Sequence, residues 1–182
     1  MSPDEKKVYR DFGKDWMDDA EYFRQQRAVG QSFQECVATR LRAQGVDPIV
    51  SYNDGFRASV AEIQRYTHES KDLLIRGHHF EVKSRAVQFT SPDDWPRSYW
   101  PMFLDTVDGL NAKSVEPTGY VFISQKTYAI MGVLLKSIQD WSIEKRFDNQ
   151  RGFAENFYCI PRSCVLSEPE LVQVLRALPA ST

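Results

Sequence analysis

Hydrophobic residues spaced three and four apart predict a helix over residues 31–44. Its apolar stripe consists of Phe33, Cys36, Val37 and Leu41. We expect Gly30 to interrupt the chain before this helix and Gly45 to end it, since glycine favours the residue that follows a helix. The preceding residues 1–29 are polar with a thin aromatic edge, and they predict a helical extension.

Short apolar runs after this helix predict a series of strands. The expected strands are residues 49–52, 102–107, 119–124, 128–135 and 156–160. The strand at 128–135 is expected to form a hairpin with that at 119–124. A short helix is expected over residues 58–66. The chain ends with a helix over residues 167–178, which begins with Ser167 and Glu170 at capping-box spacing.

The stretch KDLLIRGHHFEVKSR, residues 71–85, has the pattern of a hairpin. We place its two-residue turn at Gly77-His78, which sets Leu74 opposite Glu81 and Asp72 opposite Lys83. Because side chains alternate between the faces of a strand, Asp72, Glu81 and Lys83 then share one face. The opposite face is apolar and is expected to pack on the core; it consists of Leu73, Ile75, Phe80 and Val82.

The composition is that of one globular domain spanning residues 1–182. Hydrophobic residues make up 42% and charged residues 26% of the chain, which excludes a disordered or collagen-like protein. No apolar run reaches the roughly 18 residues of a membrane span. The three cysteines lack metal-site spacing, so we expect free thiols and a cytoplasmic protein. The formal net charge of −2 neither indicates nor excludes a nucleic-acid partner. These observations predict an α/β (α+β) fold with a central mixed sheet flanked by helices.

Two carboxylates and an ammonium on one strand face indicate metal chemistry. Carboxylate oxygens are the ligands that Mg²⁺ or Mn²⁺ prefers, so Asp72 and Glu81 are candidate metal ligands. The backbone carbonyl of Val82 is a plausible further ligand. Lys83 beside the metal is suited to orient a water molecule or to stabilise a pentavalent phosphate.

Asp72, eight residues and then Glu81-Val82-Lys83 resemble the motif of the PD-(D/E)XK nuclease superfamily, which has the restriction-endonuclease-like fold. The resemblance covers residues 28–135, with a helix before the motif and a strand after it. The stretch YTHESKDLLIRGHHFEVKSRAVQF is similar to small nuclease-like proteins that are common in phage and prophage genomes. The resemblance implies a metal-dependent nuclease, with Asp72 and Glu81 as ligands, Lys83 as the catalytic lysine and Gln125 as a supporting or phosphate contact.

The chain departs from this family at two places. Lys71 stands where the motif name has proline. In the first helix, where the family often supplies a glutamate directly after an aromatic residue, Phe33 is followed by Gln34 and only then by Glu35. Gln34 lies near the edge of the apolar stripe, whereas Glu35 lies about 160° from its centre. Either residue is a candidate to assist the site, and one metal is expected rather than two.

Other interpretations of these residues stay open. The three motif residues are also ordinary on a solvated strand face, where one cross-strand ion pair contributes roughly 0.2–1 kcal/mol. Asp105 and Asp108 are candidate further ligands, while Lys113 is a candidate phosphate contact that we expect to be a solvated surface residue. The predicted function is hydrolysis of DNA by a metal-activated water, by a monomer or a homodimer. The alternative is a nuclease-fold binding or structural module without turnover.

Overall fold

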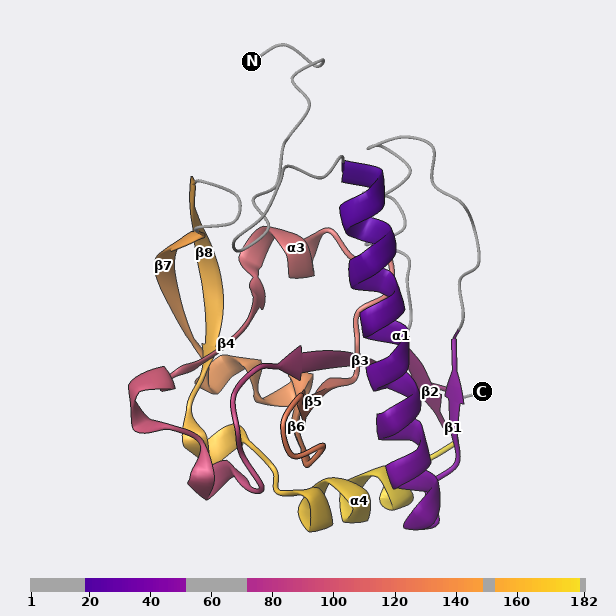
Figure 1. Ribbon diagram of the computed structural model, residues 1–182. Coiled ribbons are helices and arrows are strands. Elements are labelled where there is room, and N and C mark those ends of the chain that lie inside the picture. Colours follow the sequence, from indigo (N-terminus) through magenta and orange to yellow (C-terminus); the bar gives the residue numbers. More distant parts are fainter. Residues whose placement is uncertain (1–18, 52–71, 149–152, 181–182) are drawn as a thin grey trace.

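The computed structural model describes residues 19–51, 72–148 and 153–180. In these ranges the chain has a mixed α/β fold with two sheets and a few flanking helices, as Figure 1 shows. A five-stranded sheet has the order β1-β2-β3-β5-β6, and a three-stranded sheet has the order β4-β8-β7. Strands β3 and β5 are parallel, whereas the other neighbouring pairs are antiparallel. The predicted fold class, with a mixed central sheet, is therefore confirmed.

The strands of the larger sheet are β1 (Pro48–Val50), β2 (Leu73–Ile75), β3 (His78–Arg85), β5 (Gly119–Ser124) and β6 (Ile130–Leu134). Those of the smaller sheet are β4 (Met102–Thr106), β7 (Ser142–Asp148) and β8 (Phe153–Ile160). The described α-helices are α1 (Asp19–Ala43), α3 (Val107–Asn111) and α4 (Glu168–Ala177). No described helix is long and apolar enough to cross a membrane.

Helix α1 continues through Gly30, so the expected interruption is wrong: residues 19–43 form one helix, and the rest of the expected extension lies outside the described residues. Glycine inside a helix costs only about 1 kcal/mol, which the packing of the apolar stripe offsets. The predicted end is correct. Gly45 has a φ of +70°, its amide donates to Arg42, and the amide of Val46 donates to Leu41, as in a Schellman motif.

The five-stranded sheet separates two hydrophobic clusters. One lies under α1 and α4 and includes Val37 and Leu41 from the stripe together with Leu73, Ile75 and Phe80 from the hairpin. The other lies between the sheet and strands β4 and β8, and it includes Tyr120, Phe122, Met102, Leu104 and Ile160. Alternate residues of β5 thus enter different clusters, and all six are buried. Both faces of the central sheet are covered.

The hairpin turn is formed by Arg76 and Gly77, not by Gly77-His78. Both residues have positive φ angles, 54° and 84°, as the two central positions of a type I′ turn require. Leu74 therefore pairs with His79 rather than with Glu81, and Leu73 pairs with Phe80. Moving the turn by one position shifts the pairing by two residues, so the apolar face still packs on the core.

Several further expectations differ from the structure. The first strand begins and ends earlier than 49–52, and residues 107–111 form α3, a helix that the sequence did not predict. Strand β7 was not expected, because three consecutive charged residues separate its two apolar residues, Ile143 and Phe147, so the apolar/polar alternation of a strand is absent. These two side chains are 56% and 62% exposed. The helix expected over residues 58–66 lies outside the described residues. Strands β5, β6 and β8 and helix α4 were predicted, and Glu170 accepts hydrogen bonds from the Ser167 backbone and hydroxyl.

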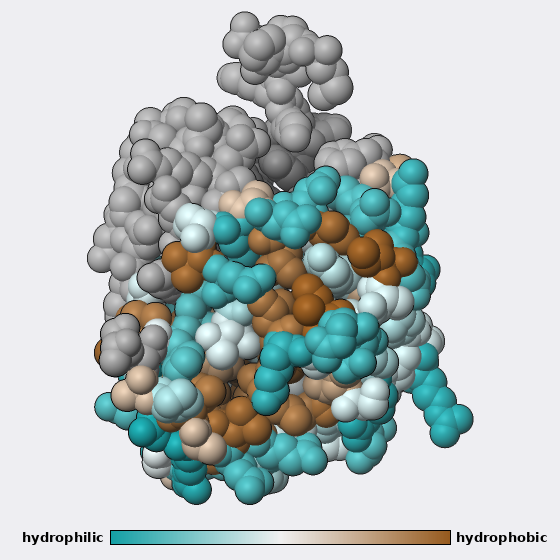
Figure 2. All heavy atoms as spheres, turned by 180° about the vertical axis from the view of Figure 1, so that it is seen from behind, coloured by the Kyte–Doolittle hydropathy of each residue, from teal (hydrophilic) through white to brown (hydrophobic). Residues whose placement is uncertain are grey.

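Hydrophobic side chains reach the surface in the middle of the face opposite to that of Figure 1, within a border of hydrophilic ones (Figure 2). The chain is hydrophilic on average, with a mean hydropathy of −0.49, but its exposed hydrophobic side chains gather on this face.

Two glycine substitutions test the packing of α1 and of the central sheet. Nothing lies within 4 Å of a Cβ added at Gly30, so Gly30→Ala should raise the free energy of unfolding by about 0.5–1 kcal/mol. A Cβ added at Gly119 lies 2.5 Å from the backbone oxygen of Val133, so Gly119→Ala should lower it by about 1–3 kcal/mol. Urea unfolding of both variants measures these changes, and a destabilised Gly30→Ala variant would contradict a continuous α1.

Candidate functional site

Glu81 is a carboxylate buried inside the fold. It lies on β3, its side chain points away from α1, and it is 6% exposed. Lys83 follows two positions later on the same face, and its Nζ lies 3.2 Å from Oε2 of Glu81. The structure thus brings together two of the three residues of the sequence motif.

Two residues from the crossover between β3 and β5 complete a cluster of charges around Glu81. Asp105 is on β4, and its Oδ2 lies 3.3 Å from Nζ of Lys83. Lys113 follows α3, and its Nζ lies 2.6 Å from Oε1 of Glu81 and 3.6 Å from Oδ2 of Asp105. Each lysine therefore bridges both carboxylates. We call these four residues the charge quartet.

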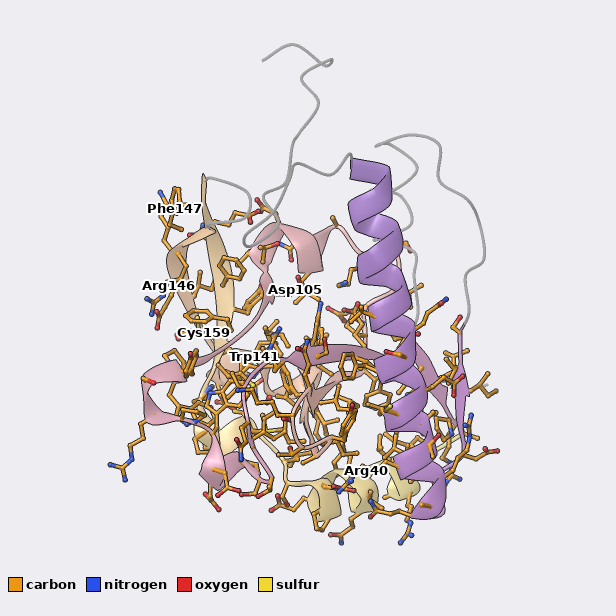
Figure 3. The ribbon with its side chains drawn as sticks, in the orientation of Figure 1. Arg40, Asp105, Trp141, Arg146, Phe147 and Cys159 are labelled. Carbon is orange, nitrogen blue, oxygen red and sulfur yellow. The ribbon has the colours of Figure 1, made fainter. Side chains whose placement is uncertain are left out.

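The quartet lies between the two sheets. Figure 3 shows Asp105 on the side of the smaller sheet nearest to β3, whereas Arg146 and Phe147 lie on the outer side of the β7–β8 hairpin. Lys113 has only 8% of its side chain exposed, so the expectation that it is a solvated surface residue is wrong. Helix α3 is the reason: it turns the chain back after β4, because Thr106 accepts a hydrogen bond from the Gly109 amide at its N-terminus.

Asp72 directly precedes β2, and its carboxylate is close enough to Glu81, Lys83 and Lys113 for their charges to affect its pKa. Its Oδ2 accepts a hydrogen bond of 2.7 Å from the backbone amide of Val82. The Val82 amide is the next β3 amide after Phe80 that points toward β2. The Asp72 carboxylate accepts its hydrogen bond in place of a backbone carbonyl of β2. Extending the observed register places Asp72 opposite Glu81, not opposite Lys83 as expected. Among the described residues, no hydrogen bond or ion pair joins the Asp72 carboxylate to a side chain of the quartet.

The structure distinguishes between the two helix residues that the sequence left open. Gln34 on α1 donates a hydrogen bond of 2.7 Å from Nε2 to Oδ1 of Asp72. Glu35 points elsewhere and lies 3.9 Å from Arg42 of the same helix. Gln34 thus reaches the motif aspartate, as its position at the edge of the stripe allowed.

Val82 and Gln125 lie on opposite sides of this arrangement. The N–H and C=O of one strand residue point to the same edge, so the Val82 carbonyl, like its amide, points toward Asp72. Gln125 is exposed after β5, and its side chain donates to the hydroxyl of Ser84 at 3.2 Å. Among the described residues, no hydrogen bond joins Gln125 to Asp72, Glu81 or Lys83, so the structure does not bring Gln125 together with the other candidate residues.

Burial and neighbouring charges shift the pKa values of these groups. Burial raises the pKa of Asp72 to about 6, and the carboxylate of Glu81 adds to this, while the Val82 amide, Lys83 and Lys113 oppose it. Burial also opposes the charged forms of Asp105 and Lys83. Their mutual attraction prevails, so the pKa of Asp105 is lowered and that of Lys83 is raised. The two groups stay ionised as a pair.

Two buried polar atoms next to these residues lack a hydrogen-bond partner among the described residues. They are Oε1 of Gln34 and the hydroxyl of Tyr120. Tyr120 is fully buried, pairs in register with Glu81 and lies on the same face, with Lys83 Nζ 5.7 Å from its ring centroid. After burial, the charges of Glu81 and Asp105 contribute most to its raised pKa. The site therefore offers an unused acceptor and an unused donor.

The donor set fits a hard divalent cation. It consists of carboxylate and amide oxygens, with the Val82 carbonyl directed to the same edge. Among the described residues, no three His, Cys, Asp or Glu side chains are close enough to form a metal site by themselves. A cation would need the neutral oxygen of Gln34, the Val82 carbonyl or a rearranged lysine in addition to the carboxylates. Asp72 and Glu81 retain unused lone pairs for this purpose.

Comparisons with known proteins give no match: no protein-family model, no curated protein and no solved structure is similar to the chain at a significant level.

Asp105 and Lys113 show what sequence reasoning missed. Both were weighed as single residues, but nothing in their spacing placed them beside Glu81. One general rule could have indicated this: two parallel neighbouring strands such as β3 and β5 need a long crossover, and the crossover must return to the sheet beside β3, where Glu81 lies. The unexpected α3 makes this return short.

Replacing Asp72 tests its environment through the pH dependence of stability in the metal-free protein. The carboxyl has a pKa of about 6 when folded and 3.8 ordinarily, so between these values the folded state binds more protons than the unfolded state. Stability of the wild type then falls as the pH rises. The free energy of unfolding of Asp72→Asn, relative to wild type, should increase by about 1–3 kcal/mol between pH 4 and pH 7.

Urea unfolding at several pH values with a chelator present measures this difference. The exposed Asp108→Asn variant is the matched control. A difference for Asp72→Asn that stays constant over this range would show that Asp72 is not buried as described.

Proposed function

We propose that the chain is a metal-dependent nuclease that hydrolyses phosphodiester bonds of DNA with a metal-activated water. The observation that carries the proposal is the meeting of residues from three separate segments. Gln34 of the helix, Asp72 at the end of β2 and the Glu81-Val82-Lys83 run of β3 are linked by contacts of 2.7 to 3.2 Å. The order of helix, hairpin and following strand also agrees with what the resemblance implies.

In this proposal Asp72 and Glu81 hold Mg²⁺ or Mn²⁺, with the Val82 carbonyl beside them. The ion supplies acidification of a bound water and neutralisation of charge on the phosphate. Gln34 and the Val82 amide fix the orientation of the Asp72 carboxylate through one hydrogen bond to each of its oxygens. They therefore hold a ligand without needing a charge of their own.

Lys83 is the group suited to stabilise the reaction's negative charge. Its pKa is raised by Asp105 and Glu81 against the effect of burial, so it carries a positive charge at neutral pH. About a quarter of its side chain is exposed, compared with 8% for Lys113, so Lys83 is the lysine that solvent and substrate reach more readily. An ammonium held in a poorly solvated position interacts strongly with a developing phosphorane.

A second candidate function is a binding or structural module on the same scaffold. The observation in its favour is that both oxygens of Glu81 are already paired with lysines. Uptake of Mn²⁺ separates the two proposals, because a module of this kind has no reason to bind the ion at this site.

Substituting Asp72 and Lys83 tests the nuclease proposal. Asp72→Asn and Lys83→Met should each lower Mg²⁺- or Mn²⁺-dependent cleavage of DNA at least about a hundredfold, because the first loses a ligand charge and the second a stabilising cation. Linear, circular and branched DNA are incubated with each variant, with and without the ion. Exposed residues without a proposed role provide matched controls of the same chemistry, Asp140→Asn and Lys136→Met.

Circular dichroism establishes that the variants are folded. Cleavage by both variants at the wild-type rate would overturn the mechanism. A wild type that neither cleaves any of the substrates nor takes up Mn²⁺ would favour the binding module.

A further inference from the structure

The charge quartet includes two residues that the proposed function does not use. Asp105 and Lys113 come from the crossover segment and not from the sequence motif, yet Lys113 makes the shortest contact to Glu81, at 2.6 Å. A side chain that is 8% exposed and carries a full charge is expensive to bury, and such pairs are weak sources of stability compared with apolar packing. Their presence beside candidate metal ligands therefore calls for a role.

The Lys113 ammonium neutralises the two carboxylates of the quartet, as a bound metal ion would. It bridges Oε1 of Glu81 and Oδ2 of Asp105, two oxygens from different sheets, at 2.6 and 3.6 Å. Lys83 bridges the same two side chains from the more exposed side, at 3.2 and 3.3 Å. Two acids and two lysines give the quartet no net charge.

A second observation shows that the quartet does not satisfy its surroundings. The hydroxyl of Tyr120 is fully buried beside Glu81 on the neighbouring strand and has no hydrogen-bond partner among the described residues. A buried hydroxyl without a partner costs about 1–3 kcal/mol. Tyr120 thus supplies an unused polar group on the strand next to Glu81, which a bound ion with its water would satisfy.

Formal charges also agree with a site that exchanges cations. A divalent ion added to the quartet leaves two charges in excess. The Asp72 carboxylate and one phosphodiester group bring one negative charge each, so the ion, the five side chains and the substrate together are neutral. Releasing Lys113 from Glu81 frees one oxygen for the ion and one ammonium for the phosphate.

We propose that Asp105 is a further carboxylate ligand of the metal site and that the Lys113 ammonium is a built-in competitor of the metal, which must leave Glu81 when the ion binds. This inference rests on the proposed metal site at Glu81. It goes further by assigning two residues outside the motif and by making metal affinity depend on a lysine that is itself no ligand.

Mn²⁺ binding to the full chain, measured by isothermal titration calorimetry at constant pH, tests this inference. Lys113→Met removes the competing charge at similar side-chain volume and should tighten Mn²⁺ binding at least tenfold. Asp105→Asn removes a ligand charge and should weaken binding at least tenfold. Lys136→Met, at an exposed position, is the matched control and should bind within twofold of wild type. Glu81→Gln should lose the ion.

Thermal unfolding with and without Mn²⁺ keeps the test decisive if Lys113→Met is poorly folded. Without the ion this variant should melt below wild type, since Glu81 loses its nearest partner. Mn²⁺ at one fixed concentration in large excess should raise its melting temperature by more than that of wild type, because stabilisation by a ligand that binds the folded state increases with the logarithm of its affinity. A Lys113→Met variant that Mn²⁺ fails to stabilise would overturn the inference.

The results also separate this inference from the proposed function. If wild type binds Mn²⁺ and Glu81→Gln does not, while Lys113→Met and Asp105→Asn bind like Lys136→Met, the metal site stands and the quartet is structural. If neither wild type nor Lys113→Met binds Mn²⁺, both proposals are overturned.

Discussion

The need to compensate one buried carboxylate governs the arrangement of the centre of this fold. Glu81 lies on a central strand, and a charge placed there is strongly unfavourable unless cations reach it. One lysine comes from the same strand and the other from the segment after α3. The compensation therefore requires that the crossover from β4 through α3 returns to this face of the sheet. The crossover that the parallel β3–β5 pair needs is thus the same segment that brings Lys113 to Glu81.

The opposite face of the same strands explains why the charged face can be held in place. Leu73, Ile75 and Phe80 pack under α1, and Val37 and Leu41 of that helix are fully buried against them. The same packing brings Gln34 to Asp72, because Gln34 lies at the edge of the apolar stripe. A helix that is held by its hydrophobic side thereby positions a polar contact at the end of β2. Along β3, Phe80 and Val82 face the helix while Glu81 and Lys83 face the other side, so one alternation of residues determines both the packing and the charged cluster.

The sequence predicted those parts of the fold that depend on local patterns. The stripe of α1, the cap at Gly45, the apolar face of the hairpin and the β5–β6 pair follow from spacing alone. The turn was misplaced because Arg76, not histidine, adopts a positive φ beside Gly77, and a composition rule does not favour arginine there. The prediction of the faces survived because the error shifted the register by two residues. Strand β7 was missed because three charged residues separate its exposed Ile143 and Phe147, so the chain shows no alternation there.

The candidate site was predictable only where its residues lie on one element or its neighbour. Glu81 and Lys83 are two positions apart, so alternation alone places them together, whereas Asp105 and Lys113 reach them through tertiary packing that no spacing encodes. These distant residues are also the ones that make the charged face of β3 a buried, ion-paired surface rather than a solvated one. Replacing a buried group of paired charges by apolar residues of similar volume is often neutral or stabilising, so stability alone does not account for the quartet. The proposed metal site rests on this pattern: charges kept buried, beside an aspartate with a raised pKa and a Tyr120 hydroxyl that has no hydrogen-bond partner among the described residues.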